Sequence, residues 1–189
     1  DPTMHYLFTP DRDDHLVGAD LATQEAMLTY DPERHPYAMA ELGPGNQCTY
    51  HRRPILTPAD AEAMTLVKLG SGANLIGYYM FHGGTNPLGK LSTMQESKAT
   101  GYLNDLPELS YDFQAPIREY GQIAESYRAL KCLHLFLRDF GAEFALTQSI
   151  FPPENATAPE NTETLRFAAR DAGGSGYLFV NNYQRHLKM

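Results

Sequence analysis

The chain has 189 residues, of which 42% are hydrophobic and 20% charged, and its formal net charge is −8. This composition allows a core of one to one and a half domains and excludes a chain that is disordered by composition. The negative charge argues against nucleic-acid binding, which favours a basic face. No run of 18 or more apolar residues predicts a membrane span.

The first part of the chain predicts one helix and one buried strand. Residues 1–36 are rich in Asp, Pro and His, and a helix is expected from about Leu16 to Tyr30. Residues 37–42 form a short, mainly apolar segment, which is followed by Gly43-Pro44-Gly45. This pattern predicts a buried strand that is followed by a loop.

A second helix and strand complete a βαβ unit. Thr57 is a natural N-cap, Pro58 suits the first helical position, and the helix is expected to continue to Gly70-Ser71-Gly72. An apolar, aromatic strand follows from Ala73 to Phe81. Two strands with a helix between them predict a parallel pair with a right-handed crossover.

The C-terminal half predicts a long loop, a long helix and a change to β-structure. The segment 82–115 has little periodicity, and a loop of that length is usually functional. Apolar residues at three- and four-residue steps predict a helix over 116–140 that ends at Gly141. Strands are expected over 143–147, 164–170 and 176–181, with a linker at 151–163 and a turn at 171–175.

Glu41 is the first candidate for chemistry, because it lies at the C-terminal end of a predicted parallel strand. That is where a barrel keeps its active site. Retaining glycosidases need one ionised carboxylate as nucleophile and one protonated carboxyl as acid, about 5 Å apart. On position alone the alternative stays open, namely a structural carboxylate held by backbone N–H groups or paired with Arg52 or Arg53.

A second set of candidates follows the strand that ends near Phe81. Tyr79, His82, Thr85 and Asn86 offer an aromatic face and hydrogen-bonding groups of the kind that bind sugars. Alternation along the strand places Tyr79 and Phe81 on one face and Tyr78 and Met80 on the other. The alternative is that these side chains belong to the core and that Gly83-Gly84 is a tight turn.

The sequence predicts no metal site and no cofactor. The seven histidines are scattered and show no H-E-x-x-H pair. No G-x-S-x-G motif is present, which argues against a serine hydrolase. Cys48 and Cys132 lie far apart in sequence and are expected to be free, half-buried thiols.

Two motifs in order now resemble one family. Tyr79-Met80-Phe81-His82-Gly83-Gly84-Thr85-Asn86 is similar to the Tyr-Met-Phe-x-Gly-Gly-Thr-Asn signature of the family 35 glycoside hydrolases, the β-galactosidases. Ser110-Tyr111-Asp112-Phe113-Gln114-Ala115-Pro116 resembles that family's Ser-Tyr-Asp-Tyr-x-Ala-Pro segment, and Glu119-Tyr120-Gly121 also agrees. The resemblance runs from about residue 36 to 140.

The resemblance implies a (β/α)8 barrel with retaining chemistry on terminal, non-reducing β-galactosyl units. Glu41 matches the family nucleophile at the end of the seventh strand, and Tyr79 matches a sugar-contacting tyrosine of the eighth. His82 and Asn86 are expected to line the pocket, and Asp112 to stabilise the loop before the last helix. The family's usual aromatic residues after the nucleophile are replaced here by Leu42-Gly43-Pro44-Gly45-Asn46-Gln47, which leaves the substrate open.

The family's acid/base Glu lies in an Asn-Glu-x-Tyr type motif, which does not occur in the 189 residues. The fold class expected is therefore α/β, with residues 1–141 as the C-terminal part of a (β/α)8 catalytic barrel and 142–189 as the start of a β-rich domain. The missing N-terminal part would supply the acid, so the isolated chain is expected to be inactive.

Three functional hypotheses follow from these motifs. The first is a retaining exo-acting β-galactosidase that binds a β-galactoside or oligosaccharide. The others are a related β-glycosidase with another sugar specificity and a non-catalytic carbohydrate-binding protein on a barrel scaffold. An extracellular or periplasmic location is favoured over the cytoplasm, and the oligomeric state stays open.

Overall fold

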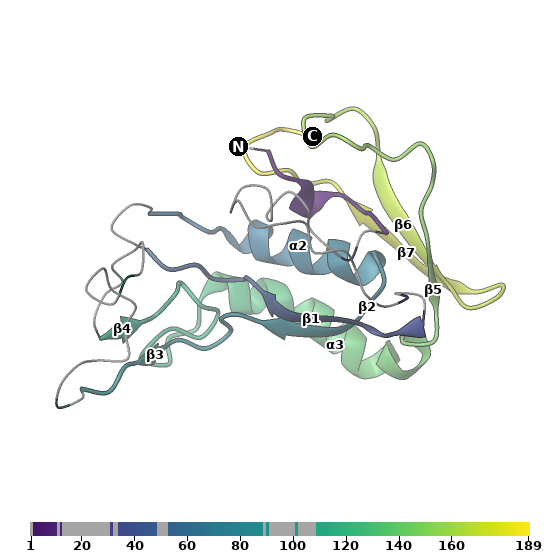
Figure 1. Ribbon diagram of the computed structural model, residues 1–189. Coiled ribbons are helices and arrows are strands. Elements are labelled where there is room, and N and C mark those ends of the chain that lie inside the picture. Colours follow the sequence, from purple (N-terminus) through teal and green to yellow (C-terminus); the bar gives the residue numbers. More distant parts are fainter. Residues whose placement is uncertain are drawn as a thin grey trace. The chain divides into compact units, whose positions relative to one another are not determined.

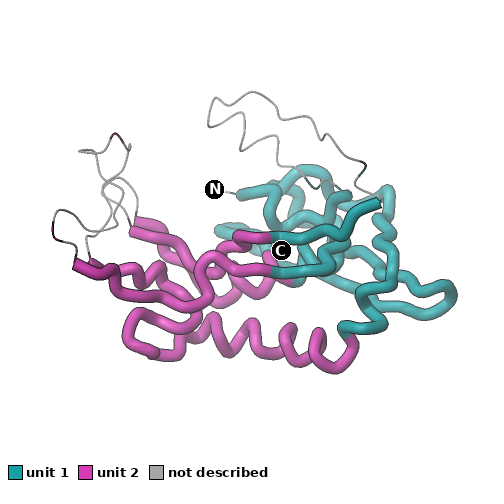
Figure 2. Tube along the Cα trace, turned by 60° about the horizontal axis from the view of Figure 1, so that its bottom comes forward, with its two compact units in different colours: residues 1–39, 66–76, 141–189 teal, residues 40–65, 77–140 magenta. Residues whose placement is uncertain are grey.

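The computed structural model describes residues 2–10, 12, 31, 34–48, 53–88, 90, 101 and 109–189. The helix expected over 16–30 lies outside the described residues. Figure 1 labels the helices and strands along the chain. The described residues divide into two compact units, which are coloured in Figure 2, and several elements contribute residues to both. Unit 1 comprises residues 1–39, 66–76 and 141–189, and unit 2 comprises residues 40–65 and 77–140.

The expected βαβ unit is present. β1 (Tyr37–Leu42), α2 (Pro58–Gly70) and β2 (Ala73–Tyr78) follow one another, and β1 pairs with β2. Tyr37 N–H bonds the Asn74 side chain at 3.0 Å, and Tyr79 N–H bonds the Leu42 carbonyl at 3.0 Å. The bonded residue of β2 thus lies further along the chain when the bonded residue of β1 does. The two strands therefore run in the same direction, and the α/β class is confirmed.

The start of α2 has the predicted cap. The Thr57 hydroxyl accepts from the backbone N–H of Asp60 at 3.3 Å, and the Asp60 carboxylate accepts from the N–H of Thr57 at 2.7 Å. This reciprocal arrangement is a capping box with aspartate in place of glutamate. The predicted bounds of this helix, Pro58 to Gly70, are confirmed.

The last helix differs from the prediction at both ends. α3 covers Glu125–Phe144 rather than 116–140. The N–H of Ile117 donates to Phe81 O at 2.9 Å, and Gly83 N–H donates to Ile117 O at 2.8 Å, so this stretch pairs with the segment after β2 instead of starting a helix. Gly141 lies inside α3 and does not end it.

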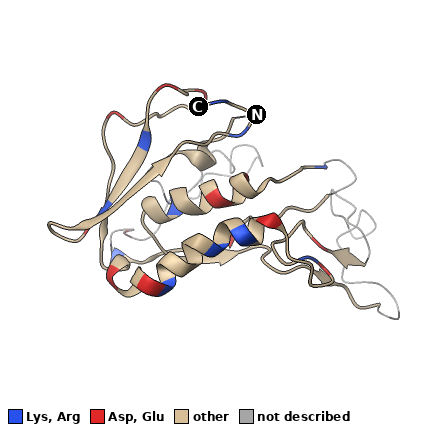
Figure 3. Cartoon of the chain, turned by 180° about the vertical axis from the view of Figure 1, so that it is seen from behind, with Lys and Arg blue, Asp and Glu red and all other residues tan. Residues whose placement is uncertain are grey.

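α3 is amphipathic, as its apolar periodicity predicts. Leu130 is fully buried, while acidic and basic side chains are distributed along the helix (Figure 3). The strand expected at 143–147 is wrong, because the chain there forms the end of the helix and a turn. The carbonyl of Phe144 accepts from the N–H of Thr147 at 3.1 Å and from its hydroxyl at 2.6 Å, which closes that turn.

The C-terminal residues of unit 1 form an antiparallel sheet in the order β5 (Gln148–Ile150), β6 (Arg166–Asp171) and β7 (Gly176–Asn181). The bounds predicted for the last strand are confirmed. The turn between β6 and β7 is confirmed too, since Ala172 N–H bonds Ser175 O at 2.8 Å and Gly173 and Gly174 have φ of 78° and 113°. No helix or strand interrupts the expected linker at 151–163.

Arg170 holds unit 1 together from its centre. The side chain is 1% exposed and its guanidinium lies 4.2 Å from the ring centroid of Phe144. It donates to the carbonyls of Leu69 at 2.7 Å, Phe144 at 3.3 Å and Thr147 at 3.2 Å. Leu69 and Phe144 lie at the C-terminal ends of α2 and α3, where carbonyl groups carry partial negative charge, so the buried cation is stabilised there.

Candidate functional site

The site is built where the two parallel strands end. The bond from Tyr79 N–H to Leu42 O is the backbone contact at the carboxyl edge of the β1–β2 pair. Glu41 precedes Leu42, so its carboxylate lies at the same edge as Tyr79. A parallel sheet of an α/β protein offers its side chains to ligands at this edge.

Glu41 is exposed at this edge, whereas its neighbour Leu42 is 3% exposed. Among the described residues, no hydrogen bond or ion pair holds the Glu41 carboxylate. The structural alternative of a pair with Arg53 therefore has no support in this part of the chain, and Arg52 lies outside it. The carboxylate is consequently available to a ligand.

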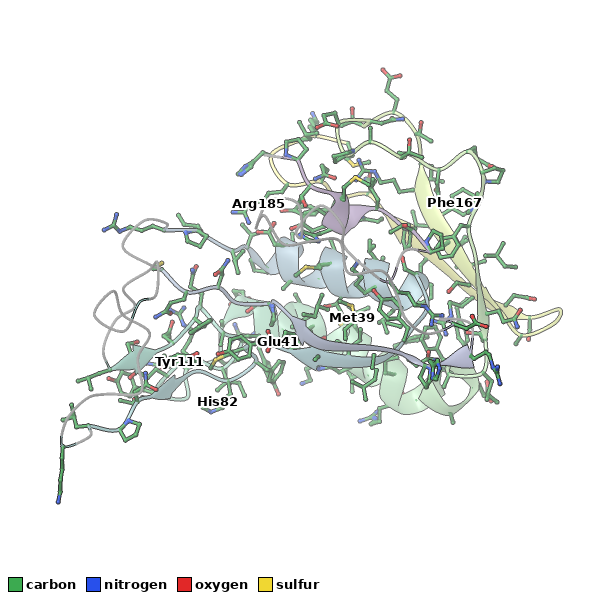
Figure 4. All side chains as sticks on the ribbon, viewed as in Figure 1. Met39, Glu41, His82, Tyr111, Phe167 and Arg185 are labelled. Carbon is green, nitrogen blue, oxygen red and sulfur yellow. The ribbon has the colours of Figure 1, made fainter. Side chains whose placement is uncertain are left out.

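Tyr79 belongs to a cluster of three aromatic residues. Its hydroxyl is hydrogen-bonded to the hydroxyl of Tyr111, and its ring meets that of Phe113 edge-on at 5.5 Å between centroids. Tyr111 and Phe113 contact each other at 4.4 Å. Figure 4 labels Glu41 on β1 and Tyr111 on β4 (Ser110–Tyr111). From the sequence, Tyr111 and Phe113 were named only as parts of a motif. Two aromatic residues on either side of Asp112 could have indicated an aromatic cluster at this position.

The predicted separation of faces after β2 is wrong in one respect. Tyr78 and Phe81 stack on the same side at 5.5 Å between ring centroids, and both contact His134 of α3. The reason is that β2 ends at Tyr78, so the two-residue alternation of a strand does not continue. Tyr78 and Phe81 therefore support the strand end, and Tyr79 alone turns to the aromatic cluster.

His82 and Asn86 lie in the segment that follows. His82 is exposed, and its Nδ1 donates to the carbonyl of Gly83, which leaves Nε2 as the acceptor of the neutral ring. Asn86 N–H donates to Leu109 O at 2.8 Å, while its side-chain Nδ2 is buried without a partner among the described residues. Within the described residues, His82 Nε2 and Asn86 Nδ2 therefore each have no hydrogen-bond partner.

Glu119 holds the two short strands β3 (Gly84–Thr85) and β4 together. The hydroxyl of Thr85 donates to Glu119 Oε1 at 2.5 Å and that of Ser110 to Oε2 at 2.7 Å. These two hydroxyl groups lower the pKa of the Glu119 carboxyl. Thr85 thus serves the framework here. The loop expected over 82–115 contains this antiparallel ladder, which its sequence did not predict.

Asp112 organises the turn between β4 and α3. Its carboxylate accepts from Arg118 Nε at 2.7 and 2.9 Å, from Glu119 N–H at 3.0 Å and from Gln114 N–H at 3.1 Å. Burial alone would raise the pKa of Asp112, but these hydrogen bonds and the charge of Arg118 lower it. The expected role of Asp112 in stabilising this loop is confirmed.

The described residues hold no cluster of three or more His, Cys, Asp or Glu side chains that fits a metal ion. Within the same residues, no helix is long and apolar enough to cross a membrane. Cys48 and Cys132 are free, as expected, but both are exposed rather than half-buried.

Two cavities in the described parts of the chain measure about 200 and 270 Å³ and are lined by residues of unit 1. Neither Glu41 nor Tyr79 lines them. Because Glu41 is exposed at its edge of the sheet, further walls are needed there to enclose a sugar.

Comparison with known families gives the class of protein. Residues 10–137 match the family model described as glycosyl hydrolases family 35. This match covers more than half of the chain, which is thereby a glycosidase by class. The chain belongs to glycoside hydrolase family 35.

Membership of this family implies a (β/α)8 catalytic domain. The described residues contain one parallel pair with its crossover helix and two small antiparallel sheets. The βαβ unit is the repeating element of such a barrel, and the strand ends that carry Glu41 and Tyr79 are the edge where barrels keep their active sites.

Proposed function

We propose that this chain forms part of a retaining exo-acting β-galactosidase, which hydrolyses terminal non-reducing β-D-galactosyl residues. The observation that carries the proposal is the exposed carboxylate of Glu41, which no described residue holds by a hydrogen bond or ion pair, at the carboxyl edge where Tyr79 N–H bonds Leu42 O. In a retaining mechanism this carboxylate attacks the anomeric carbon while the glycosidic C–O bond breaks and the second carboxyl protonates the departing aglycone oxygen. The resulting glycosyl–enzyme ester is then hydrolysed by water, which gives a proton back to the second carboxylate.

The other residues bind and orient the sugar in this proposal. The Tyr79 hydroxyl, fixed by Tyr111, donates a hydrogen bond to the sugar or to the nucleophile. His82 offers Nε2 as a further polar contact, and Asn86, whose side-chain Nδ2 is buried, lines the pocket wall. None of these groups needs a metal or cofactor, because the chemistry is carried by two carboxyl groups.

We propose that the second carboxyl lies outside these 189 residues. Residues 1–141 would be the C-terminal part of the catalytic barrel, and 142–189 the start of a β-rich domain. The exposure of Glu41 supports this assignment, because a complete barrel surrounds its catalytic carboxylates with loops from several strands. The antiparallel sheet β5–β6–β7 supports β-structure after α3, within the compact unit that also contains residues 1–39 and 66–76.

The test is Glu41→Gln in the full-length enzyme, assayed with a chromogenic β-galactoside. The amide keeps the shape of the carboxylate but cannot act as the nucleophile, so turnover should fall at least about a thousandfold. Glu62→Gln, at an exposed position of α2, is the matched control and should leave turnover unchanged. Near wild-type turnover by the Glu41 variant would show that the assignment is wrong.

A related β-glycosidase specificity is the second candidate. It is favoured by one observation, that the residues after Glu41 depart from the aromatic pattern of the family. A panel of chromogenic β-glycosides assayed with the full-length enzyme separates the two, since kcat/KM should be highest for the galactoside. Sugar binding without turnover of any member of the panel would instead identify a non-catalytic carbohydrate-binding protein.

A further inference from the structure

The side-chain amide of Gln114 ties two loops of unit 2 together. Its Nε2 donates to the carbonyls of Pro54 at 2.8 Å and Asn46 at 3.1 Å, and lies 3.8 Å from Cys48 Sγ. Its Oε1 accepts from the backbone N–H of Leu56 at 3.4 Å. All of these partners belong to the loop that follows Glu41, whose described residues are 43–48 and 53–57. We call this the post-nucleophile loop.

Two further contacts join the same segments. A Cβ on Gly45 would overlap the carbonyl oxygen of Phe113 and come within 3.3 Å of Ala115, so the two backbones are packed directly against each other. Gln47 is 7% exposed, and its Nε2 lies 3.5 Å from the carbonyl of Ser110. The post-nucleophile loop is therefore fastened to the segment 110–115 at several points, with Gln114 making the most bonds.

The backbone conformation at Gln114 is unusual. Phe113 and Gln114 both have φ of 55°, in the left-handed region that residues with a Cβ seldom adopt. Asp112 holds this turn by accepting from Gln114 N–H. Such a conformation persists only where its surroundings enforce it, and it often marks a functional position.

The turn around Asp112 contacts both Tyr79 and the post-nucleophile loop. Tyr111 and Phe113 contact Tyr79, whereas Gln114 contacts the loop that continues from Glu41. The segment 110–114 therefore links the backbone that carries the proposed nucleophile to the side chain proposed to orient the sugar.

We propose that Gln114 is a positioning residue, which sets the alignment of the post-nucleophile loop, and with it Glu41, relative to Tyr79 and the bound sugar. The inference rests on the proposed function of Glu41. It extends that function to a position that the Ser-Tyr-Asp-Tyr-x-Ala-Pro motif leaves unspecified. A loss of alignment of the reacting groups lowers kcat more than it raises KM, because proximity acts mainly on the reacting geometry.

Two substitutions test the positioning role of Gln114, so that the test does not fail if one of the variants does not fold. Gln114→Asn keeps an amide and tolerates the left-handed backbone, but is one methylene too short to reach both carbonyls. Gln114→Gly fits the positive φ without strain and removes the amide completely. Gln122→Asn is the matched control, since Gln122 is exposed and its side chain accepts a hydrogen bond from the N–H of its near neighbour Tyr120.

Cys48 provides a readout that needs no activity. It is exposed in the post-nucleophile loop and next to the Gln114 amide, while Cys132 on α3 is an internal reference. Alkylation of native full-length enzyme is followed over time by mass spectrometry of the Cys48 and Cys132 peptides. Release of the loop should raise the Cys48 rate several-fold in both Gln114 variants and leave the Cys132 rate unchanged.

The kinetic arm measures kcat and KM for a chromogenic galactoside at a temperature where every variant is folded. We expect kcat to fall about tenfold with KM within about twofold, for both Gln114 variants and not for Gln122→Asn. An unchanged rate of Cys48 alkylation would show that Gln114 does not hold the post-nucleophile loop in place. A raised alkylation rate with unchanged kcat would show that holding the loop does not align the reacting groups. Failure of the wild type to hydrolyse any galactoside would overturn the proposed function instead, and the alkylation rates would still report on whether Gln114 holds the loop.

Discussion

The backbone N–H of Tyr79 donates to the carbonyl of Leu42 at 3.0 Å, directly after β2 has ended. This bond fixes where the chain leaves the sheet, and it keeps the residue after Glu41 in contact with the residue that leads into the aromatic cluster. The proposed nucleophile and the proposed sugar-orienting tyrosine are thus held by the same parallel pair, although 38 positions separate them in the sequence.

Tyr79→Phe tests the hydroxyl at this position. The variant keeps the edge-on contact with Phe113 but loses the hydrogen bond to Tyr111 and to the substrate. We expect kcat/KM to fall about tenfold to a hundredfold, with little change in melting temperature, since one or two hydrogen bonds in the transition state are lost. Tyr120→Phe is the control, because Tyr120 is 78% exposed.

Asp112→Asn tests the turn that carries Tyr111, Phe113 and Gln114. The fold lowers the pKa of Asp112, so the ionised carboxylate stabilises the folded state above the unfolded pKa of about 4. The variant should lose about 1–2 kcal/mol of unfolding free energy at pH 7. The difference should shrink as the pH falls through the folded pKa, when the wild type also loses the charge.

Urea unfolding at pH 7 and at about pH 2, below the lowered pKa of Asp112, measures this difference. Asp139→Asn, on the exposed side of α3, provides the control. A difference in unfolding free energy that is the same at both pH values would contradict the role assigned to the Asp112 charge.

His134→Gln tests the hydrogen bond between His134 of α3 and Tyr78 at the end of β2. The Tyr78 hydroxyl lies 2.9 Å from His134 Nε2, and burial lowers the pKa of His134 and raises that of Tyr78. Tyr78 therefore donates to a neutral imidazole. Because the unfolded chain binds the proton first, stability should fall as the pH drops below about 6.5, by at most about 1.4 kcal/mol per pH unit for this group.

Glutamine accepts the same hydrogen bond without titrating, so the stability of His134→Gln should depend less on pH between 5 and 8. Thermal unfolding across this range measures the slope, and His186→Gln, at an exposed position, is the control. Equal slopes for the wild type and His134→Gln would contradict the account.

Arg170→Lys tests the buried cation of unit 1. Burial lowers the pKa of Arg170 to about 10, which keeps it charged at neutral pH. Lysine cannot reproduce the planar fork that serves Leu69, Phe144 and Thr147, so buried carbonyls lose their donors. We expect a loss of roughly 3–5 kcal/mol of unfolding free energy. Arg138→Lys, with 71% of its side chain exposed, should have no comparable effect.

Elements with strong local signals were predicted to the residue. The bounds of β1, α2 and β7 follow from turn and capping residues next to them in the sequence, such as Gly43-Pro44-Gly45 and the N-cap Thr57. The family and the glycosidase class came from motifs whose residues are adjacent in the chain, and the family match confirms both.

Elements decided by contacts distant in sequence were missed. Ile117 has the right spacing for a helix, but its N–H is taken by Phe81 and its carbonyl by Gly83. The end of α3 depends on Thr147 and Arg170 rather than on Gly141. These partners cannot be read from helical periodicity, which reports only on residues three or four positions apart.

The candidate site was predicted in part for the same reason. Glu41, Tyr79, His82 and Asn86 were named from motif positions, and their roles stay proposals. The partners of Tyr79 and the bonds of Gln114 arise where two loops meet, and no sequence pattern records a side-chain amide that binds the backbone of another loop.

The most direct test of the account is to identify the residue that carries the glycosyl–enzyme ester. The full-length enzyme is incubated with a 2-deoxy-2-fluoro-β-galactoside bearing a good leaving group, which slows hydrolysis of the ester more than its formation, and the labelled peptide is sequenced by mass spectrometry. The account predicts one fluorogalactosyl group per active site, attached to Glu41. A label on any other carboxylate would contradict it.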